Sequence, residues 1–258
     1  MDNFQKLLDI MAALRAENGC PWDKEQTRES LKPFLVEETY EVIEAIDEKA
    51  TSKIKEELGD LLFQIIFHAQ LAKEQGEFDM DDVINTISTK MIGRHPHVFG
   101  TAKFETPEQV LKQWEERKRE EGKGRESILE GVPKELPSLL KAHRIQSRAA
   151  RVGFDWKRVE DVLGKLDEEL AEFRKALESK DQARIEDELG DVFFSLVNIA
   201  RFVGVNPEDA LRKTISKFIS RFRYIEIKAA ESGRNLSDMT LEEMDALWEE
   251  AKYPQQNQ

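Results

Sequence analysis

The chain has 258 residues, of which 40% are hydrophobic, so it can bury one large core or two ordinary ones. No apolar run approaches the roughly 18 residues of a membrane span, and the amphipathic N-terminus lacks a signal peptide's basic region and cleavage site. The formal charge of −13 disfavours broad nucleic-acid binding, and the single cysteine, Cys20, cannot form an internal disulfide. We therefore expect a cytoplasmic protein of two domains that binds neither membranes nor nucleic acid.

Helical periodicity dominates the sequence, whereas strand signals are weak, and this predicts an all-α fold. Segments rich in Gly and Pro separate the periodic stretches. The predicted helices are, in chain order, 2–17, 28–49, 52–75, 80–92, 107–121, 137–151, 158–178, 181–203, 207–231 and 240–252.

The two halves of the chain repeat each other. The block EETYEVIEAIDEKATSKIKEELGD at 37–60 aligns with EELAEFRKALESKDQARIEDELGD at 168–191, an offset of 131 residues. Two later patterns follow in the same order in each half, KxxxR at 90–94 and 217–221 and WEExK at 114–118 and 248–252. This is a tandem duplication. It predicts a first domain at 1–120, a linker at 121–136 and a second domain at 137–258.

Carboxylates recur at helical spacing inside each copy. Glu38 and Glu41 share one helix face, and Glu57 and Asp60 share another, because positions i and i+3 are neighbours on a helix. Apolar residues flank Glu38 on its own face, which predicts that it points inward. The second helix carries a polar seam from Glu57 through Asp60 to Gln64 along an otherwise apolar surface. The second copy repeats both pairs as Glu169, Glu172, Glu188 and Asp191.

Four carboxylates in one half-buried place need either protonation or cations to neutralise them. An all-oxygen ligand set without His or Cys favours Mg²⁺ or Mn²⁺ over zinc. A ferritin-like di-iron site is the competing chemistry, but no Glu-x-x-His motif accompanies any of the four histidines. One acidic motif alone would be read as a solvated helix face. The duplication, with the same spacing in both copies, disfavours that interpretation.

Two glycines, Gly59 and Gly190, lie inside the predicted second helix of each pair. Glycine within a helix costs about 1 kcal/mol relative to alanine, so a compensating gain is expected. Close approach of a facing helix would supply it, and a local kink is the alternative.

Together with CPWD at 20–23 and RHPHVF at 94–99, these motifs make the chain resemble the MazG family of nucleoside triphosphate pyrophosphohydrolases. The resemblance covers essentially the whole chain. It implies two tandem helical domains, each forming a four-helix-bundle-type unit on dimerisation, and hence a homodimer. It also implies hydrolysis of NTPs and dNTPs at the α-phosphorus to the monophosphate and pyrophosphate, dependent on Mg²⁺ with Mn²⁺ as a substitute and tolerant of the base.

The resemblance also assigns residues in each copy. The implied metal ligands are Glu38, Glu41, Glu57, Asp60, Glu169, Glu172, Glu188 and Asp191. Each repeat also contains an EExxE motif, at 37–41 and 168–172. Its carboxylates would accept the proton of the attacking water, namely Glu38, Glu41, Glu169 and Glu172. The implied substrate contacts are Lys90, Arg94, Lys118, Lys217, Arg221 and Lys252 for phosphates, and Trp114 and Trp248 for the base.

Other interpretations remain open from the sequence. The chain could serve one dedicated nucleotide, such as dUTP or phosphoribosyl-ATP, or be a non-catalytic helical interaction protein. The basic pairs could be surface salt bridges, and each tryptophan could belong to a core. We expect both halves to bind metal and one of them to dominate turnover.

Overall fold

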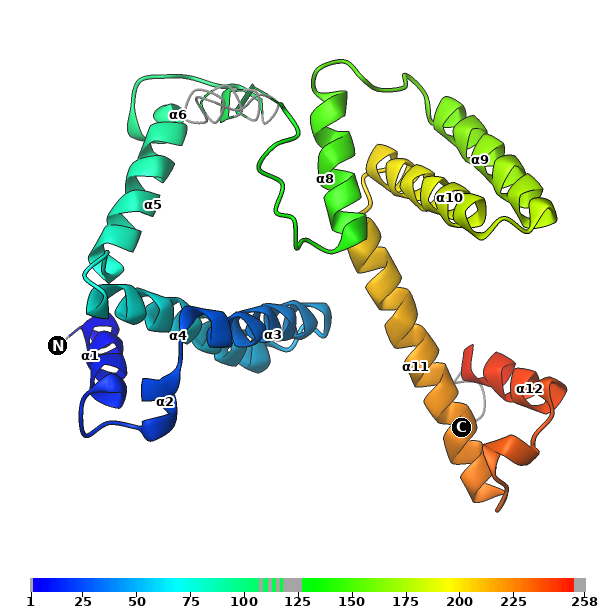
Figure 1. Cartoon of the computed structure of the whole chain (residues 1–258), viewed down its shortest axis with the longest axis horizontal. Coiled ribbons are helices and arrows are strands. Elements are labelled where there is room, and N and C mark those ends of the chain that lie inside the picture. Colours follow the sequence, from blue (N-terminus) through cyan, green and yellow to red (C-terminus); the bar gives the residue numbers. More distant parts are fainter. Residues whose placement is uncertain (1, 107–108, 111–112, 115–116, 118–126, 253–258) are drawn as a thin grey trace. The chain divides into compact units, whose positions relative to one another are not determined.

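A computed structural model gives the structure of the chain, and it describes every residue except 1, 107–108, 111–112, 115–116, 118–126 and 253–258 (Figure 1). The described residues divide into two compact units, 1–123 and 124–258. They form helices joined by turns, with no strand in this part of the chain, which confirms the predicted all-α fold. The division between units lies near the start of the segment 121–136, whose role as a linker stays a prediction.

The first unit contains α1 (Asn3–Arg15), α2 (Pro21–Glu25), α3 (Arg28–Asp47), α4 (Thr51–Glu74), α5 (Met80–Arg94) and α6 (Pro96–Phe99). The second contains α8 (Ser138–Ala150), α9 (Val159–Ser179), α10 (Gln182–Phe202), α11 (Pro207–Glu231), the 3₁₀ helix η1 (Leu236–Asp238) and α12 (Leu241–Lys252). Nine predicted helices fall on described residues, and each is present with ends within two residues of the prediction. The predicted helix 107–121 lies largely outside the described residues. The short helices α2, α6 and η1 were not predicted, because they are too short to show a period.

Local sequence signals set where the helices begin. Thr27 and Ser30 form a reciprocal capping box at the start of α3, with each side chain accepting from the other's backbone N–H. At the start of α11, the side chain of Asn206 accepts from two backbone N–H groups, and Pro207 occupies the first turn, where its missing N–H costs nothing. Helix α5 ends at Arg94, two residues beyond the predicted end, and Pro96 explains this end because the residue before a proline disfavours the helical conformation.

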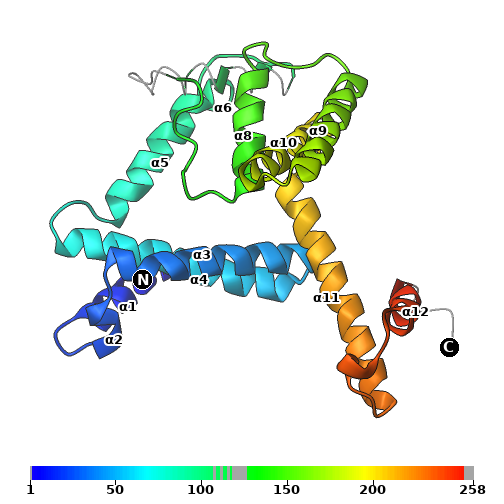
Figure 2. The same cartoon turned by 45° about the vertical axis from the view of Figure 1, so that its right-hand side comes forward.

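Each unit is built on one antiparallel helix pair, α3 with α4 and α9 with α10 (Figures 1 and 2). In both pairs the connecting turn contains a lysine in the left-handed region, Lys49 at φ 56° and Lys180 at φ 57°. Burial of apolar residues from α1, α3 and α4 forms the main core of the first unit, namely Met11, Leu31, Ile66, Phe67 and Leu71.

The second unit is anchored by packing of α8 on the α9–α10 pair. Gln146 of α8 is buried, and its Nε2 donates to the backbone oxygen of Phe194 at 2.8 Å. Arg201 near the end of α10 donates to Asn198 and forms an ion pair with Asp155, which ties the loop before α9 to α10. The long helix α11 leaves this end of α10 and carries α12 along its distal part (Figures 1 and 2).

The interior glycines Gly59 and Gly190 do not lie against a facing helix. A Cβ built at either position meets no other atom within 4 Å. The expectation of close helix approach is therefore wrong among the described residues of this chain. Space beside α4 and α10 is open at these positions, and Gly190 borders a hollow described below.

Candidate metal centres

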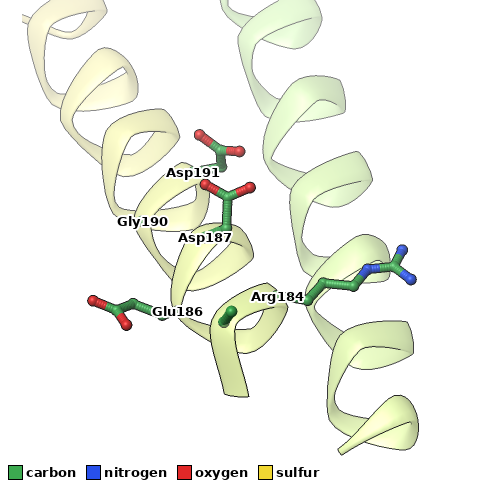
Figure 3. A pocket seen from close by; sticks show the side chains of 6 residues that line it. Arg184, Glu186, Asp187, Gly190 and Asp191 are labelled. Carbon is green, nitrogen blue, oxygen red and sulfur yellow. The ribbon is translucent and has the colours of Figure 1, made fainter. Parts of the chain in front are cut away.

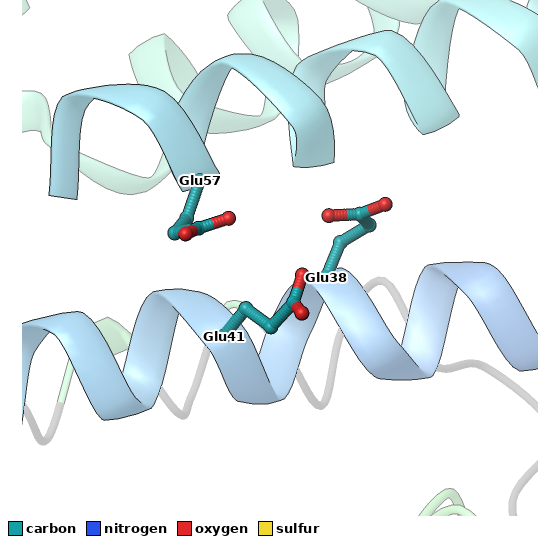
Figure 4. A group of neighbouring side chains, drawn as sticks. All are labelled: Glu38, Glu41 and Glu57. Atoms are coloured by element: carbon teal, nitrogen blue, oxygen red, sulfur yellow. The ribbon is translucent and has the colours of Figure 1, made fainter. Parts of the chain in front are cut away.

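The carboxylates of the first repeat meet between α3 and α4. Glu38 and Glu41 come from α3, and Glu57 comes from the facing stretch of α4 (Figure 4). One carboxylate oxygen of each lies within 4.8 Å of the other two. The i, i+3 spacing on α3 and the antiparallel pairing with α4 produce this convergence. We call these three residues the N-terminal cluster.

Two carboxylates of the N-terminal cluster have raised pKa values. The pKa of Glu38 is raised first by burial and then by the charges of Glu41 and Asp60, and burial is also the main cause that raises the pKa of Glu57. Among the described residues, no basic side chain forms an ion pair with the cluster. Lys53, four residues before Glu57, pairs with Glu48 at 2.8 Å instead.

The second repeat builds a matching C-terminal cluster from Glu169 and Glu172 of α9 and Glu188 of α10. Their carboxylate oxygens also lie within 4.8 Å of one another. Glu169 is buried, with 6% of its surface exposed. Burial, followed by the charge of Glu169, raises the pKa of Asp191 beside the cluster.

Cations of the chain itself contact the C-terminal cluster. The Nζ of Lys165 lies 2.6 Å from Oε1 of Glu169 and 3.0 Å from Oε1 of Glu168. The Nε of Arg184 lies 3.7 Å from Oε1 of Glu188. Contact with Glu169 is the main reason that the pKa of the Lys165 ammonium is raised. Neither cation was predicted from the sequence, although each lies four residues before a carboxylate, a spacing that favours ion pairs on a helix.

The fourth predicted metal ligand of each repeat, Asp60 or Asp191, lies outside the three-carboxylate cluster of that repeat. Both aspartates are exposed. The charge of Asp60 nevertheless helps to raise the pKa of Glu38, and the charge of Glu169 helps to raise the pKa of Asp191. The predicted polar seam on α4 is therefore wrong at Asp60. It is right at Gln64, which is buried, with no hydrogen-bond partner for its Oε1 among the described residues.

An open hollow adjoins the C-terminal cluster along α10. It is lined by Ala183, Arg184, Glu186, Asp187, Gly190 and Asp191. Figure 3 shows Asp187 and Asp191 on the side that faces the neighbouring helix, whereas Glu186 points away from it. The missing side chain of Gly190 leaves this space clear.

The predicted basic and aromatic residues pair in the same way in both units. The guanidinium of Arg94 lies 5.1 Å from the ring centroid of Trp114, and that of Arg221 lies 5.4 Å from Trp248. Each indole has a second ring neighbour, His95 at 5.0 Å and Phe218 at 5.1 Å respectively. The two repeats therefore share the arginine–tryptophan contact as well as the sequence motifs that contain these residues.

The predicted lysines are less uniform. Lys90 and Lys217 are exposed on α5 and α11. Lys252 forms an ion pair with Glu249 on its own helix. Lys118 lies outside the described residues.

The structure does not bring these Arg–Trp pairs to the carboxylates of the same unit. Helix α5 follows the C-terminal end of α4, whereas Glu57 lies near the beginning of α4 (Figures 1 and 2). Arg94 is the last residue of α5, about 20 Å further along at 1.5 Å per residue. The same order holds for Glu188 on α10 and Arg221 on α11.

Both clusters fit a hard divalent cation. Each offers at least three carboxylate oxygens within a few ångströms of one another, with no sulfur or imidazole among them. Burial, followed by the charges of neighbouring carboxylates, raises the pKa values of Glu38 and Glu57, and the charge of a bound cation would offset both effects. None of the described helices is long and apolar enough to cross a membrane.

These features define the class of the protein: an all-α, internally duplicated chain with one acidic cluster suited to divalent cations in each repeat. The model of the MazG nucleotide pyrophosphohydrolase domain matches residues 26–99 and 157–225, more than half of the chain and one match per repeat. The chain belongs to the MazG family.

Full-length relatives agree with this assignment. The nucleoside triphosphate pyrophosphohydrolase/pyrophosphatase MazG of Thermotoga maritima is 48% identical over 96% of this chain and 95% of its own length. The nucleoside triphosphate pyrophosphohydrolase of Escherichia coli K12 is 44% identical over 98% of each chain. A crystal structure of a mazG-related protein from Thermotoga maritima covers 45% of this chain and 98% of its own, with 31% identity and a TM-score of 0.39.

Proposed function

We propose that the protein hydrolyses nucleoside triphosphates at the α-phosphorus, dependent on Mg²⁺ or Mn²⁺, to give the monophosphate and pyrophosphate. The general reaction, nucleoside triphosphate pyrophosphohydrolysis, is that of the family and of the named relatives. Metal dependence, the position of cleavage and the tolerance of the base are parts of our proposal. The main observation in its support is that Glu38, Glu41 and Glu57 converge and have no ion-pair partner among the described residues. Such a cluster repels a triphosphate unless a cation lies between them.

In each repeat the clustered carboxylates, together with Asp60 or Asp191, would hold the divalent cation. When bound, it supplies charge neutralisation for the phosphates and acidifies a nearby water. Glu38 is half-buried with a raised pKa, so it is suited to accept a proton from the attacking water. Glu169 is bound to Lys165, which leaves Glu172 as the better proton acceptor in the second repeat.

Phosphate and base contacts are proposed for the Arg–Trp pairs. Arg94 and Arg221 can donate in a planar fork to phosphate oxygens, and the paired indole holds each guanidinium in place. Lys90 and Lys217, one helical turn earlier, extend the same positive face. Trp114 and Trp248 can stack on any base, which supports a broad substrate range.

A homodimer would complete the site. Helix α11 exposes a stripe of apolar residues at helical spacing, Leu211, Ile215, Phe218, Ile219 and Phe222. Surface of this kind on one helix is typical of a protein interface. Because the basic pairs lie far from the carboxylates within one unit, an antiparallel partner helix is a natural source of the missing cations.

The test is product analysis with purified protein, Mg²⁺ and each of the eight common NTPs and dNTPs. We expect monophosphate and pyrophosphate, with turnover lost on addition of a chelator. In ¹⁸O-labelled water the label should appear in the monophosphate. Diphosphate with orthophosphate would overturn the α-phosphorus assignment, and turnover of one nucleotide alone would favour a dedicated enzyme. Absence of turnover under every condition would favour a non-catalytic protein.

A further inference from the structure

The two carboxylate clusters differ in what lies beside their first carboxylate. In the C-terminal cluster, Lys165 holds Glu169 at 2.6 Å, and the Glu169 side chain is only 7% exposed. The repeat places Phe34 at the position of Lys165. The ring of Phe34 packs against the hydrophobic core and lies edge-on to Trp22 at 5.8 Å. No ammonium can reach Glu38 from that position.

A second pair of equivalent positions differs in the same direction. Arg184 approaches Glu188 within 3.7 Å, whereas Lys53, its counterpart in the first repeat, is bound to Glu48 at 2.8 Å. Two basic side chains therefore contact the C-terminal cluster. Among the described residues, none forms an ion pair with the N-terminal cluster.

A cation already in place changes the free energy of binding a metal. A divalent ion that used Glu169 would lie within several ångströms of the Lys165 ammonium, because that ammonium touches the donor carboxylate. Repulsion between the two positive charges is strong in a half-buried setting. Binding then requires the loss of a short, charge-assisted hydrogen bond to a buried carboxylate. Neither cost applies at the N-terminal cluster.

We propose that Lys165 is a built-in counter-ion of the C-terminal cluster. It competes with the divalent cation for Glu169 and makes this cluster bind metal alone more weakly than the N-terminal cluster. The inference rests on the divalent-cation sites of the proposed function. Its consequence is an order of filling: at limiting metal the N-terminal cluster fills first.

The test measures Mn²⁺ binding without nucleotide, by electron paramagnetic resonance of unbound Mn²⁺, in full-length chains with one cluster disabled. Glu41→Gln with Glu57→Gln leaves the C-terminal cluster, and Glu172→Gln with Glu188→Gln leaves the N-terminal cluster. We expect the chain with the N-terminal cluster to bind Mn²⁺ about tenfold more tightly. Equal affinities, or tighter binding by the C-terminal cluster, would overturn the inference.

A charge-matched pair of substitutions then isolates Lys165. In the chain that keeps the C-terminal cluster, Lys165→Met should raise Mn²⁺ affinity about tenfold, and Lys165→Gln should act in the same direction. Lys157→Met, an exposed position ahead of α9 and twelve residues before Glu169, should change affinity less than about twofold, because its charge is remote from the cluster. Equal effects of Lys165→Met and Lys157→Met would mean that net charge alone is responsible and would contradict the counter-ion role. Failure of both single-cluster chains to bind Mn²⁺ would instead remove the proposed cation sites.

Discussion

Under the proposed function, single carboxylates should determine how strongly each cluster binds a divalent cation. Glu41 and Glu172 occupy equivalent positions on α3 and α9, and each supplies one of the three converging carboxylates. Replacing either with Gln removes a negative charge while keeping the shape of the side chain. The pair therefore compares the two repeats directly.

We predict unequal losses from this pair. One of Glu41→Gln and Glu172→Gln should lower Mg²⁺-dependent turnover about 100-fold, and the other less than about twofold, if one repeat dominates catalysis. Steady-state assays of the two variants at saturating Mg²⁺ check this. Asp167→Asn, which removes a charge from an exposed position of α9, is the control. Equal losses from both variants would contradict dominance by one repeat.

The ion pair of Arg15 with Glu74 gives a prediction about pH. Its atoms are 2.7 Å apart, the Arg15 side chain is buried, and the hydrogen bond lowers the pKa of Glu74 below its ordinary 4.5. A lowered pKa means that the pair stabilises the fold above that ordinary value and loses its effect as the pH falls through the folded-state pKa. Glu74→Gln should therefore lower the free energy of unfolding by about 1 kcal/mol at pH 7.

Urea unfolding of this variant and the parent at several pH values checks the prediction. The difference between them should shrink as the pH falls below about 4.5. Glu77→Gln, which breaks the more exposed pair with Arg28, should cost less. A difference that stayed constant down to low pH would show that packing, not charge, connects α1 to α4.

At the scale of whole elements, the positions of the helices follow from local sequence signals. Capping residues such as Thr27 and Asn206 and apolar periodicity predicted nine helices with small errors. The interior glycines Gly59 and Gly190 could be interpreted only in part. The sequence showed that glycine weakens the helix, but it did not predict the open space beside these positions, because that space depends on which elements pack against the helix.

Open space at Gly59 makes a stability prediction. Gly59→Ala should raise the free energy of unfolding by up to about 1 kcal/mol, since helix interiors favour alanine and no atom lies near its Cβ. Gly76→Ala, equally open but at φ +70°, should lower it by about 1 kcal/mol. Thermal or urea unfolding measures both. Destabilisation by Gly59→Ala would indicate that a partner chain or a ligand comes close to α4.

At the scale of the whole molecule, neither unit by itself brings its Arg–Trp pair to its carboxylate cluster. The exposed apolar stripe on α11 and the separation of the Arg–Trp pairs from the carboxylates both favour a dimer. The side chain of Ile219 is 60% exposed in the middle of that stripe. It is the position at which a charge should harm association most and the fold least.

We predict that Ile219→Glu converts the proposed homodimer to a monomer and removes most of the turnover. Burying an unpaired carboxylate in an interface costs several kcal/mol, whereas at an exposed position it costs little. Light scattering gives the mass, and circular dichroism checks that helix content is kept. Lys213→Glu, an exposed position earlier on the same helix, is the control for charge. A parent protein that is already monomeric would refute the dimer.

The sequence by itself determined the all-α fold and the duplication, because helical period, capping and i, i+3 spacing are local properties. It predicted four converging carboxylates in each repeat, of which the structure brings three within 4.8 Å of one another. Tertiary structure decided which charges meet. It left Asp60 at the margin, directed Lys53 to Glu48 but Lys165 to Glu169, and opened space at Gly59 and Gly190. Near-identical motifs thus received different electrostatic surroundings, since a side chain's partner depends on how neighbouring helices pack and which rotamers that packing allows.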